Sequence, residues 1–215
     1  MREKLTLLKT TRLVAVFAAA ILLAGTFVGS ARAMTLSLSG AGVAGAIPLV
    51  GFDLGAETGL NPGDAITIFD SGNVGGISLD SAANVVFTFL GSEAANSNAF
   101  DADGNAGVFT AGTAVGTSAS FDLGAGLLNF VFTTLAGSAT NGGPFGAGLS
   151  IAFADLGDGS FIALFGDGAG DSDRDDFAVK IAVSAVPLPA AVWLFLSAIL
   201  GLVSFTRIRR DQKTA

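Results

Sequence analysis

The chain has 215 residues and contains no cysteine, histidine or tyrosine. These absences exclude disulfide bonds, the usual zinc sites and the nucleophilic systems that use a histidine base. The net charge is −7, but residues 34–185 hold 16 acidic side chains against only Arg174 and Lys180, a formal charge of −14. Because such a surface repels phosphates, nucleic-acid binding is strongly disfavoured.

The first 33 residues have the three-part pattern of a secretory signal peptide. Basic residues are concentrated in the first 12 positions, an apolar stretch covers residues 13–28, and Ala31 and Ala33 form an A-x-A cleavage site. We therefore expect signal peptidase to cut after Ala33 and the rest of the chain to be exported.

Residues 34–185 form a segment long enough for one domain with its own core. It contains short runs of alternating apolar side chains that are bounded by glycine, asparagine, aspartate or serine, which is typical of β-strands. The runs cover residues 35–39, 47–52, 65–69, 85–90, 118–123, 128–133, 150–153, 161–165 and 177–183. The pattern predicts an all-β ectodomain, an antiparallel β-sandwich of jelly-roll or immunoglobulin-like kind, with an up-and-down barrel as the alternative.

Glycine, alanine and serine dominate residues 111–120 and 137–148, which we expect to be long loops. Phenylalanines alternate within the predicted strands, which favours a packed core over an exposed aromatic platform. Ser150 lies in a string that approaches a nucleophile elbow but lacks the final glycine, and the chain has no histidine to act as base. We expect Ser150 to be an ordinary strand residue.

Five carboxylates are close together between the last two predicted strands. Hard cations such as calcium prefer several oxygen ligands on a flexible loop, and alternate aspartates could converge on one ion. The spacing is not that of an EF-hand, because the glycine and the closing glutamate are missing. The candidate calcium ligands are Asp167, Asp171, Asp173, Asp175 and Asp176.

A second acidic group has oxygen-bearing side chains at alternate positions, Asp101, Asp103 and Asn105, but no acidic residue follows to complete a calcium site. For both groups the alternative is a solvated turn, rich in residues that tolerate left-handed backbone geometry.

The last thirty residues form a third segment, 186–215. It begins with the motif Val186, Pro187, Leu188, Pro189 and Ala190. The two prolines prevent a helix from continuing into the motif, so an apolar helix is predicted from residue 190 to residue 206. This helix is short for a membrane span, since its 16 apolar residues cover about 24 Å and a bilayer core is about 30 Å thick. Arg207, Arg209 and Arg210 follow it and place the tail in the cytoplasm by the positive-inside rule.

The order of motif, apolar helix and basic tail resembles the VPLPA variant of the PEP-CTERM sorting signal of Gram-negative bacteria. The resemblance covers about 28 residues and implies a precursor anchored in the inner membrane. It further implies that an exosortase cleaves near the motif and releases the ectodomain to the cell surface or the exopolysaccharide matrix. The ectodomain resembles those of such proteins only loosely, and no catalytic residue is carried over.

We expect a non-enzymatic surface or matrix protein with a structural or adhesive role in exopolysaccharide or biofilm. Its expected partners are signal peptidase, the exosortase and exopolysaccharide, and calcium is a candidate cofactor. One alternative is a carbohydrate-binding module, although the only tryptophan, Trp193, lies in the predicted anchor. Another is a secreted hydrolase built on aspartate and glutamate, for which Glu57 and Glu93 supply the only glutamates of the ectodomain.

Overall fold

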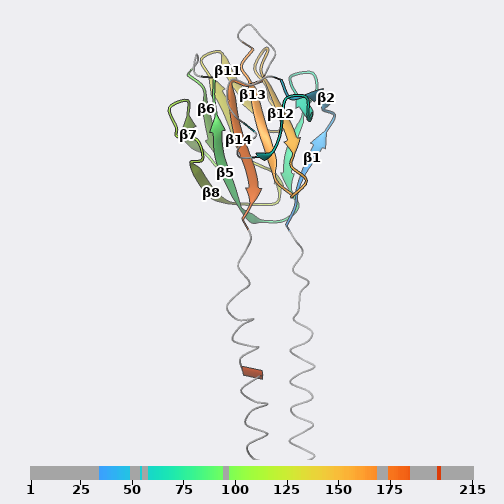
Figure 1. Cartoon of the computed structure of the whole chain (residues 1–215), viewed down its shortest axis with the longest axis vertical. Coiled ribbons are helices and arrows are strands. Elements are labelled where there is room, and N and C mark those ends of the chain that lie inside the picture. Colours follow the sequence, from blue (N-terminus) through green and yellow to red (C-terminus); the bar gives the residue numbers. More distant parts are fainter. Residues whose placement is uncertain are drawn as a thin grey trace, which may run out of the picture. The chain divides into compact units, whose positions relative to one another are not determined.

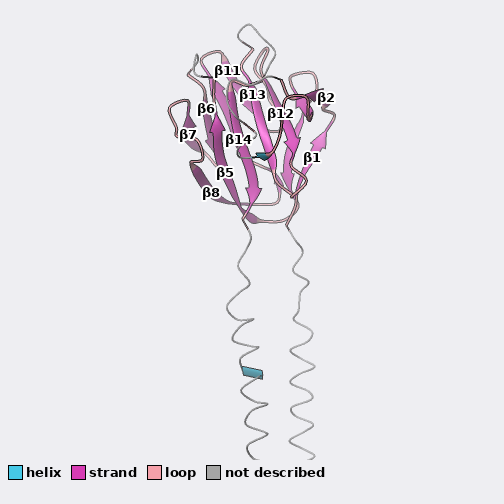
Figure 2. Ribbon diagram, in the orientation of Figure 1, coloured by secondary structure: helices cyan, strands magenta, loops and turns pink. Residues whose placement is uncertain are grey.

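The structure is a computed structural model that describes residues 34–48, 54, 58–93, 97–168, 174–184 and 198–199. The chain divides into two units, residues 1–33 and residues 34–215. The predicted signal peptide and almost all of the segment 186–215 lie outside the described residues. The described part of the second unit is all-β, and its strands pair only in antiparallel fashion (Figures 1 and 2).

Fourteen strands are present among the described residues. They are β1 (Leu36–Gly40), β2 (Val43–Ala46), β3 (Ala65–Phe69), β4 (Gly75–Leu79), β5 (Ala83–Gly91), β6 (Ala99–Ala102), β7 (Asn105–Thr110), β8 (Ser118–Leu123), β9 (Gly126–Leu127), β10 (Phe130–Thr134), β11 (Gly137–Thr140), β12 (Ser150–Asp155), β13 (Phe161–Gly166) and β14 (Phe177–Val183).

The strands form three sheets. The largest has seven strands in the order β2-β3-β12-β13-β14-β5-β8. The second has four strands in the order β11-β10-β6-β7, and the third has three in the order β1-β4-β9. Some strands that pair in a sheet are far apart in sequence, for example β14 and β5. The chain therefore crosses from one sheet to another between them, and distant segments share one core.

The main core lies between the large sheet and the two smaller ones, and phenylalanine dominates it. The rings of Phe132 in β10 and Phe165 in β13 stack with their centroids 5.1 Å apart. Phe100 in β6 contacts four other rings, among them that of Phe87 in β5 at 5.1 Å. Every phenylalanine that the structure describes is buried or half-buried, so the predicted packed core is confirmed for these residues.

A second apolar cluster covers the other face of the large sheet. Ile47 and Leu54, from the connection between β2 and β3, pack with Ile162 and Leu164 of β13. Strand β13 is consequently buried along its whole length, on both faces. Its inward and outward side chains alternate as the sequence indicates, but both sets are apolar because both faces are covered.

Eight of the nine predicted strands are present, and three of them, at residues 65–69, 118–123 and 177–183, have the predicted bounds. Of the predicted strand at residues 47–52 the structure describes residues 47 and 48, and neither is in a strand, so the prediction is wrong for these two residues. The loop predicted at residues 137–148 is also wrong at its start, where β11 pairs with β10. Small side chains suit this edge position, since pairing uses only backbone groups.

Asn141 links the smaller sheets. Its side chain is 5% exposed, its Oδ1 accepts a hydrogen bond from the Ile77 amide of β4, and its Nδ2 donates to the carbonyls of Ile77 and Leu128. Its own amide donates to the carbonyl of Phe130 in β10. Asn141 thus continues the hydrogen bonding between β4 and β10, where no strand pairing exists.

The connections gather at two opposite ends of the domain (Figure 1). Pairing of Ile151 with Phe69 and of Ser150 with Gly166 brings together the connections β3–β4, β11–β12 and β13–β14. We call this end the loop pole. At the other end, Met34 and Val183 line one cavity of about 240 Å³ together with the β12–β13 turn. The start of the domain and the end of its last strand therefore lie together at the pole opposite the loop pole.

Candidate functional site

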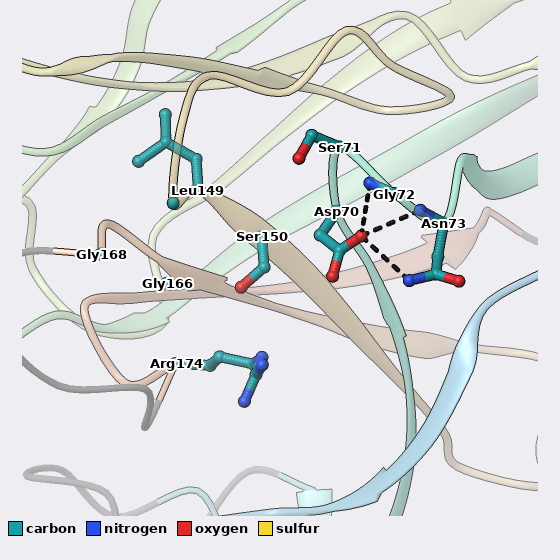
Figure 3. A pocket seen from close by; sticks show the side chains of 10 residues that line it. Asp70, Ser71, Gly72, Asn73, Leu149, Ser150, Gly166, Gly168 and Arg174 are labelled. Atoms are coloured by element: carbon teal, nitrogen blue, oxygen red, sulfur yellow. Dashed lines mark hydrogen bonds between the residues drawn. The ribbon is translucent and has the colours of Figure 1, made fainter.

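A cavity of about 420 Å³ lies at the loop pole (Figure 3). Three sequence segments and one further residue form it, and we call it the polar pocket. Its lining residues are Asp70, Ser71, Gly72, Asn73, Gly148, Leu149, Ser150, Gly166, Gly168 and Arg174. Polar atoms and bare backbone make up most of this lining, and the described residues that form it include no aromatic side chain.

Asp70 is held in place by the tight turn that follows β3. Its Oδ1 accepts hydrogen bonds from the Gly72 amide at 2.8 Å, the Asn73 amide at 2.9 Å and the Asn73 Nδ2 at 3.1 Å (Figure 3). The Gly72 hydrogen bond, helped by Asn73 and by the positive charge of Arg174, keeps the pKa of Asp70 below its ordinary value, although burial opposes this effect. Asp70 is therefore a fixed carboxylate at neutral pH.

The second oxygen of Asp70, Oδ2, accepts no hydrogen bond from the described residues. The hydroxyls of Ser71 and Ser150 likewise have no hydrogen-bond partner within the described ranges, and both residues line the polar pocket. Ser150 begins β12, so its prediction as a strand residue is confirmed. Figure 3 shows Asp70 and Ser150 beside one space, which the Arg174 side chain enters from the β13–β14 connection.

Glycines keep the polar pocket open. A Cβ at Gly166 would lie 3.0 Å from both Ser150 Oγ and Arg174 Cγ, so even an alanine side chain would crowd the space. Gly168 has a φ of +70°, and a Cβ there would come within 2.8 Å of the Gly148 carbonyl oxygen. Gly168 must be glycine if the backbone is to stay this close to Gly148, whereas at Gly166 an added methyl group would press on the side chains of Ser150 and Arg174.

Three of the five candidate calcium ligands are described, and all three are buried. Asp176 accepts a hydrogen bond from the Asp167 amide through Oδ2 at 2.6 Å and thereby closes the base of the loop. Asp175, 3% exposed, contributes its carbonyl to a hydrogen bond from the Glu93 amide. Asp171 and Asp173 lie outside the described residues. Within the described ranges no three acidic side chains are placed to hold a metal ion together, so calcium binding stays a prediction.

Asn98 was not singled out in the sequence, yet it supports the same loop. It is 2% exposed, and its Nδ2 donates to Asp167 Oδ2 at 3.4 Å and to the Asp176 carbonyl at 3.5 Å. Its Oδ1 is buried and has no hydrogen-bond partner among the described residues. A single buried asparagine leaves no repeating pattern in the sequence. Only the tertiary contact of Asn98 with Asp167 and Asp176 shows that it supports this loop.

The second acidic group forms the turn between β6 and β7. Asp101 Oδ1 accepts a hydrogen bond from the Gly107 amide at 2.6 Å, and Asn105 Nδ2 donates to the carbonyls of Ala102 and Asp103. Asp103 has a φ of 51°, in the left-handed region. These side chains therefore stabilise a tight hairpin, as the alternative interpretation of this sequence predicts.

The residues of the predicted export and sorting signals lie outside the described residues. They are Ala31, Ala33, Val186, Pro187, Leu188, Pro189, Ala190, Arg207, Arg209 and Arg210. The part of the chain that the structure describes contains no helix with the length and apolar character of a membrane span.

Comparison with known proteins found no family model, no curated protein and no solved structure that matches this chain.

Proposed function

We propose that this protein is an exported, non-enzymatic surface or matrix protein. It reaches the inner membrane through its signal peptide and is processed by an exosortase at the VPLPA-type motif. The ectodomain then serves a structural or adhesive role in exopolysaccharide or biofilm of a Gram-negative bacterium. Residues 34–185 are further proposed to form a β-sandwich of jelly-roll or immunoglobulin-like kind, which the packing of antiparallel sheets around one core supports.

The observation that best supports this function is the arrangement of the two poles. Met34 and Val183 line the same cavity at one pole, so the segments before and after the domain join it at that pole. The polar pocket is at the other pole, together with Asp167, Asp175 and Asp176, the described carboxylates of the acidic loop at residues 167–176. Attachment through either end of the domain leaves the loop pole available to a partner. This is the arrangement that a tethered or newly released adhesive domain needs.

The test is the position of the C-terminus in the native host, measured by intact mass and terminal-peptide mapping of membrane and extracellular fractions. We expect extracellular protein that ends between residues 186 and 191. A double variant, Pro187→Ala with Pro189→Ala, should remain in the membrane with Ala215 intact. Pro62→Ala, which changes an exposed turn proline of the ectodomain, is the matched control and should be processed like the wild type.

Recovery of the wild type only in the inner membrane, with Ala215 present, would overturn the sorting proposal. The segment 186–215 would then be a permanent anchor, and the ectodomain would act in the periplasm.

A further inference from the structure

We infer that the polar pocket binds one unit of a neutral, polyhydroxylated saccharide. This inference deepens the proposed matrix function and rests on it for its biological setting. The pocket volume of about 420 Å³ lies in the range of about 300–1,000 Å³ found for small-molecule sites. The pocket is also at the loop pole, opposite the ends of the domain.

The polar atoms of the pocket match the chemistry of a sugar. A sugar hydroxyl both donates and accepts hydrogen bonds, so it needs acceptors and donors close together. Asp70 Oδ2 is an ionised acceptor that no described donor engages, and Ser71 and Ser150 each bring a hydroxyl that can act either way. A hydrogen bond from a sugar hydroxyl to a carboxylate is charge-assisted and hence among the stronger ones.

The pocket is also preorganised. Three hydrogen bonds to Oδ1 fix the Asp70 carboxylate before any ligand arrives, so its orientation costs little entropy on binding. The glycine walls at Gly166 and Gly168 let a ligand approach the backbone closely, since no side chain intervenes.

Charge and composition select a neutral ligand. The domain carries a formal charge of −14, which repels an acidic saccharide, while the opposite charges of Asp70 and Arg174 in the pocket offset each other. Among the described residues, the lining contains no aromatic ring on which a sugar could stack, and Leu149 is the one apolar side chain larger than a methyl group. Binding therefore relies on hydrogen bonds, and the dissociation constant for a single unit should be on the order of 1 mM.

The experiment uses the purified full chain in a detergent that has no sugar headgroup. Saturation-transfer NMR and calorimetric titration are carried out with glucose, galactose, mannose and their short oligomers, and with glucuronate and galacturonate as acidic counterparts. We expect at least one neutral saccharide to bind and the acidic saccharides to bind at least about 10-fold more weakly.

Two variants locate the ligand. Asp70→Asn keeps an oxygen for the turn but replaces the open carboxylate oxygen, and should weaken binding at least about 10-fold. Gly166→Ala places a methyl group in the pocket and should weaken binding to a similar degree. Asp155→Asn is the matched control, because Asp155 makes the same kind of turn with the Gly157 amide at the opposite pole. It should bind like the wild type.

Three results would overturn the inference: no binding of any neutral saccharide by a folded wild type, preferential binding of the acidic saccharides, or binding unchanged in both Asp70→Asn and Gly166→Ala. Thermal melting confirms that each variant is folded. The proposed sorting route is read separately from the C-terminus, so either proposal can fail without the other.

Discussion

Replacing Asn141 by alanine should destabilise the domain markedly, because one buried side chain carries three hydrogen bonds between two sheets. The variant leaves the Ile77 amide without an acceptor, which costs about 1–3 kcal/mol. The two carbonyls that Asn141 Nδ2 reaches each keep another donor, the Leu128 amide for Ile77 and the Phe130 amide for Leu128. Losing the two hydrogen bonds that Asn141 Nδ2 donates adds about 0.5–1.5 kcal/mol each, so the total is about 2–6 kcal/mol.

Urea denaturation of residues 34–185, followed by circular dichroism and fitted as a two-state transition, measures this loss. Asn129→Ala is the control, because Asn129 is exposed and its side chain makes no hydrogen bond with the described residues. It should change the free energy of unfolding by less than about 0.5 kcal/mol. A loss below about 1 kcal/mol for Asn141→Ala would refute the reasoning, since it would mean that water replaces the side chain at little cost.

A second substitution tests whether the Asn141 side chain lies against Gly76 of β4. A Cβ at Gly76 would approach Asn141 Oδ1 to 2.1 Å and the Gly142 amide nitrogen to 2.8 Å. Gly76→Ala should therefore destabilise the wild type, and its effect should be smaller when Asn141 is already alanine, because part of the clash is then gone. Additive effects of the two substitutions would show that they do not share a contact.

The remaining predictions concern the loops. Asp176→Ala should cost about 1–3 kcal/mol in urea denaturation because it leaves the buried Asp167 amide without its acceptor, and Asp176→Asn should cost less; equal losses would argue against this hydrogen bond. If the acidic loop binds calcium, added calcium should raise the melting temperature, and Asp171→Asn with Asp173→Asn should abolish the rise. A rise that survives would place the ion elsewhere or reflect general screening. Hydrogen bonds from Ser160 lower the pKa of Asp158, so the folded domain binds fewer protons than the unfolded chain. The stability that this carboxylate adds above about pH 4 is lost as the pH falls through its lowered pKa, and Asp158→Asn should flatten the acid limb of a stability–pH profile.

Local side-chain pattern was sufficient where a strand buries every second residue. Two strands show this clearly: β5, with Val85, Phe87 and Phe89 buried, and β10, with Phe130 and Phe132 buried. Their alternating apolar side chains predict a strand because alternate burial is a property of the strand itself. The same reasoning predicted that phenylalanine would fill the core. The export and sorting signals also depend on linear order alone, and their prediction awaits the terminal mapping described above.

Tertiary structure decided the rest. Strands such as β4 and β11 carry glycine and serine, and they are strands because a neighbour supplies backbone partners, which leaves no mark in their own side chains. The polar pocket unites residues 70–73, 148–150, 166, 168 and 174, and only the register of β3, β12 and β13 brings them together. The sequence around Asp70 could have indicated a turn, since aspartate, glycine and asparagine follow one another closely, but not that a pocket lies beside it. Contacts across long stretches of chain are set by packing of the whole core, and a local pattern contains no information about them.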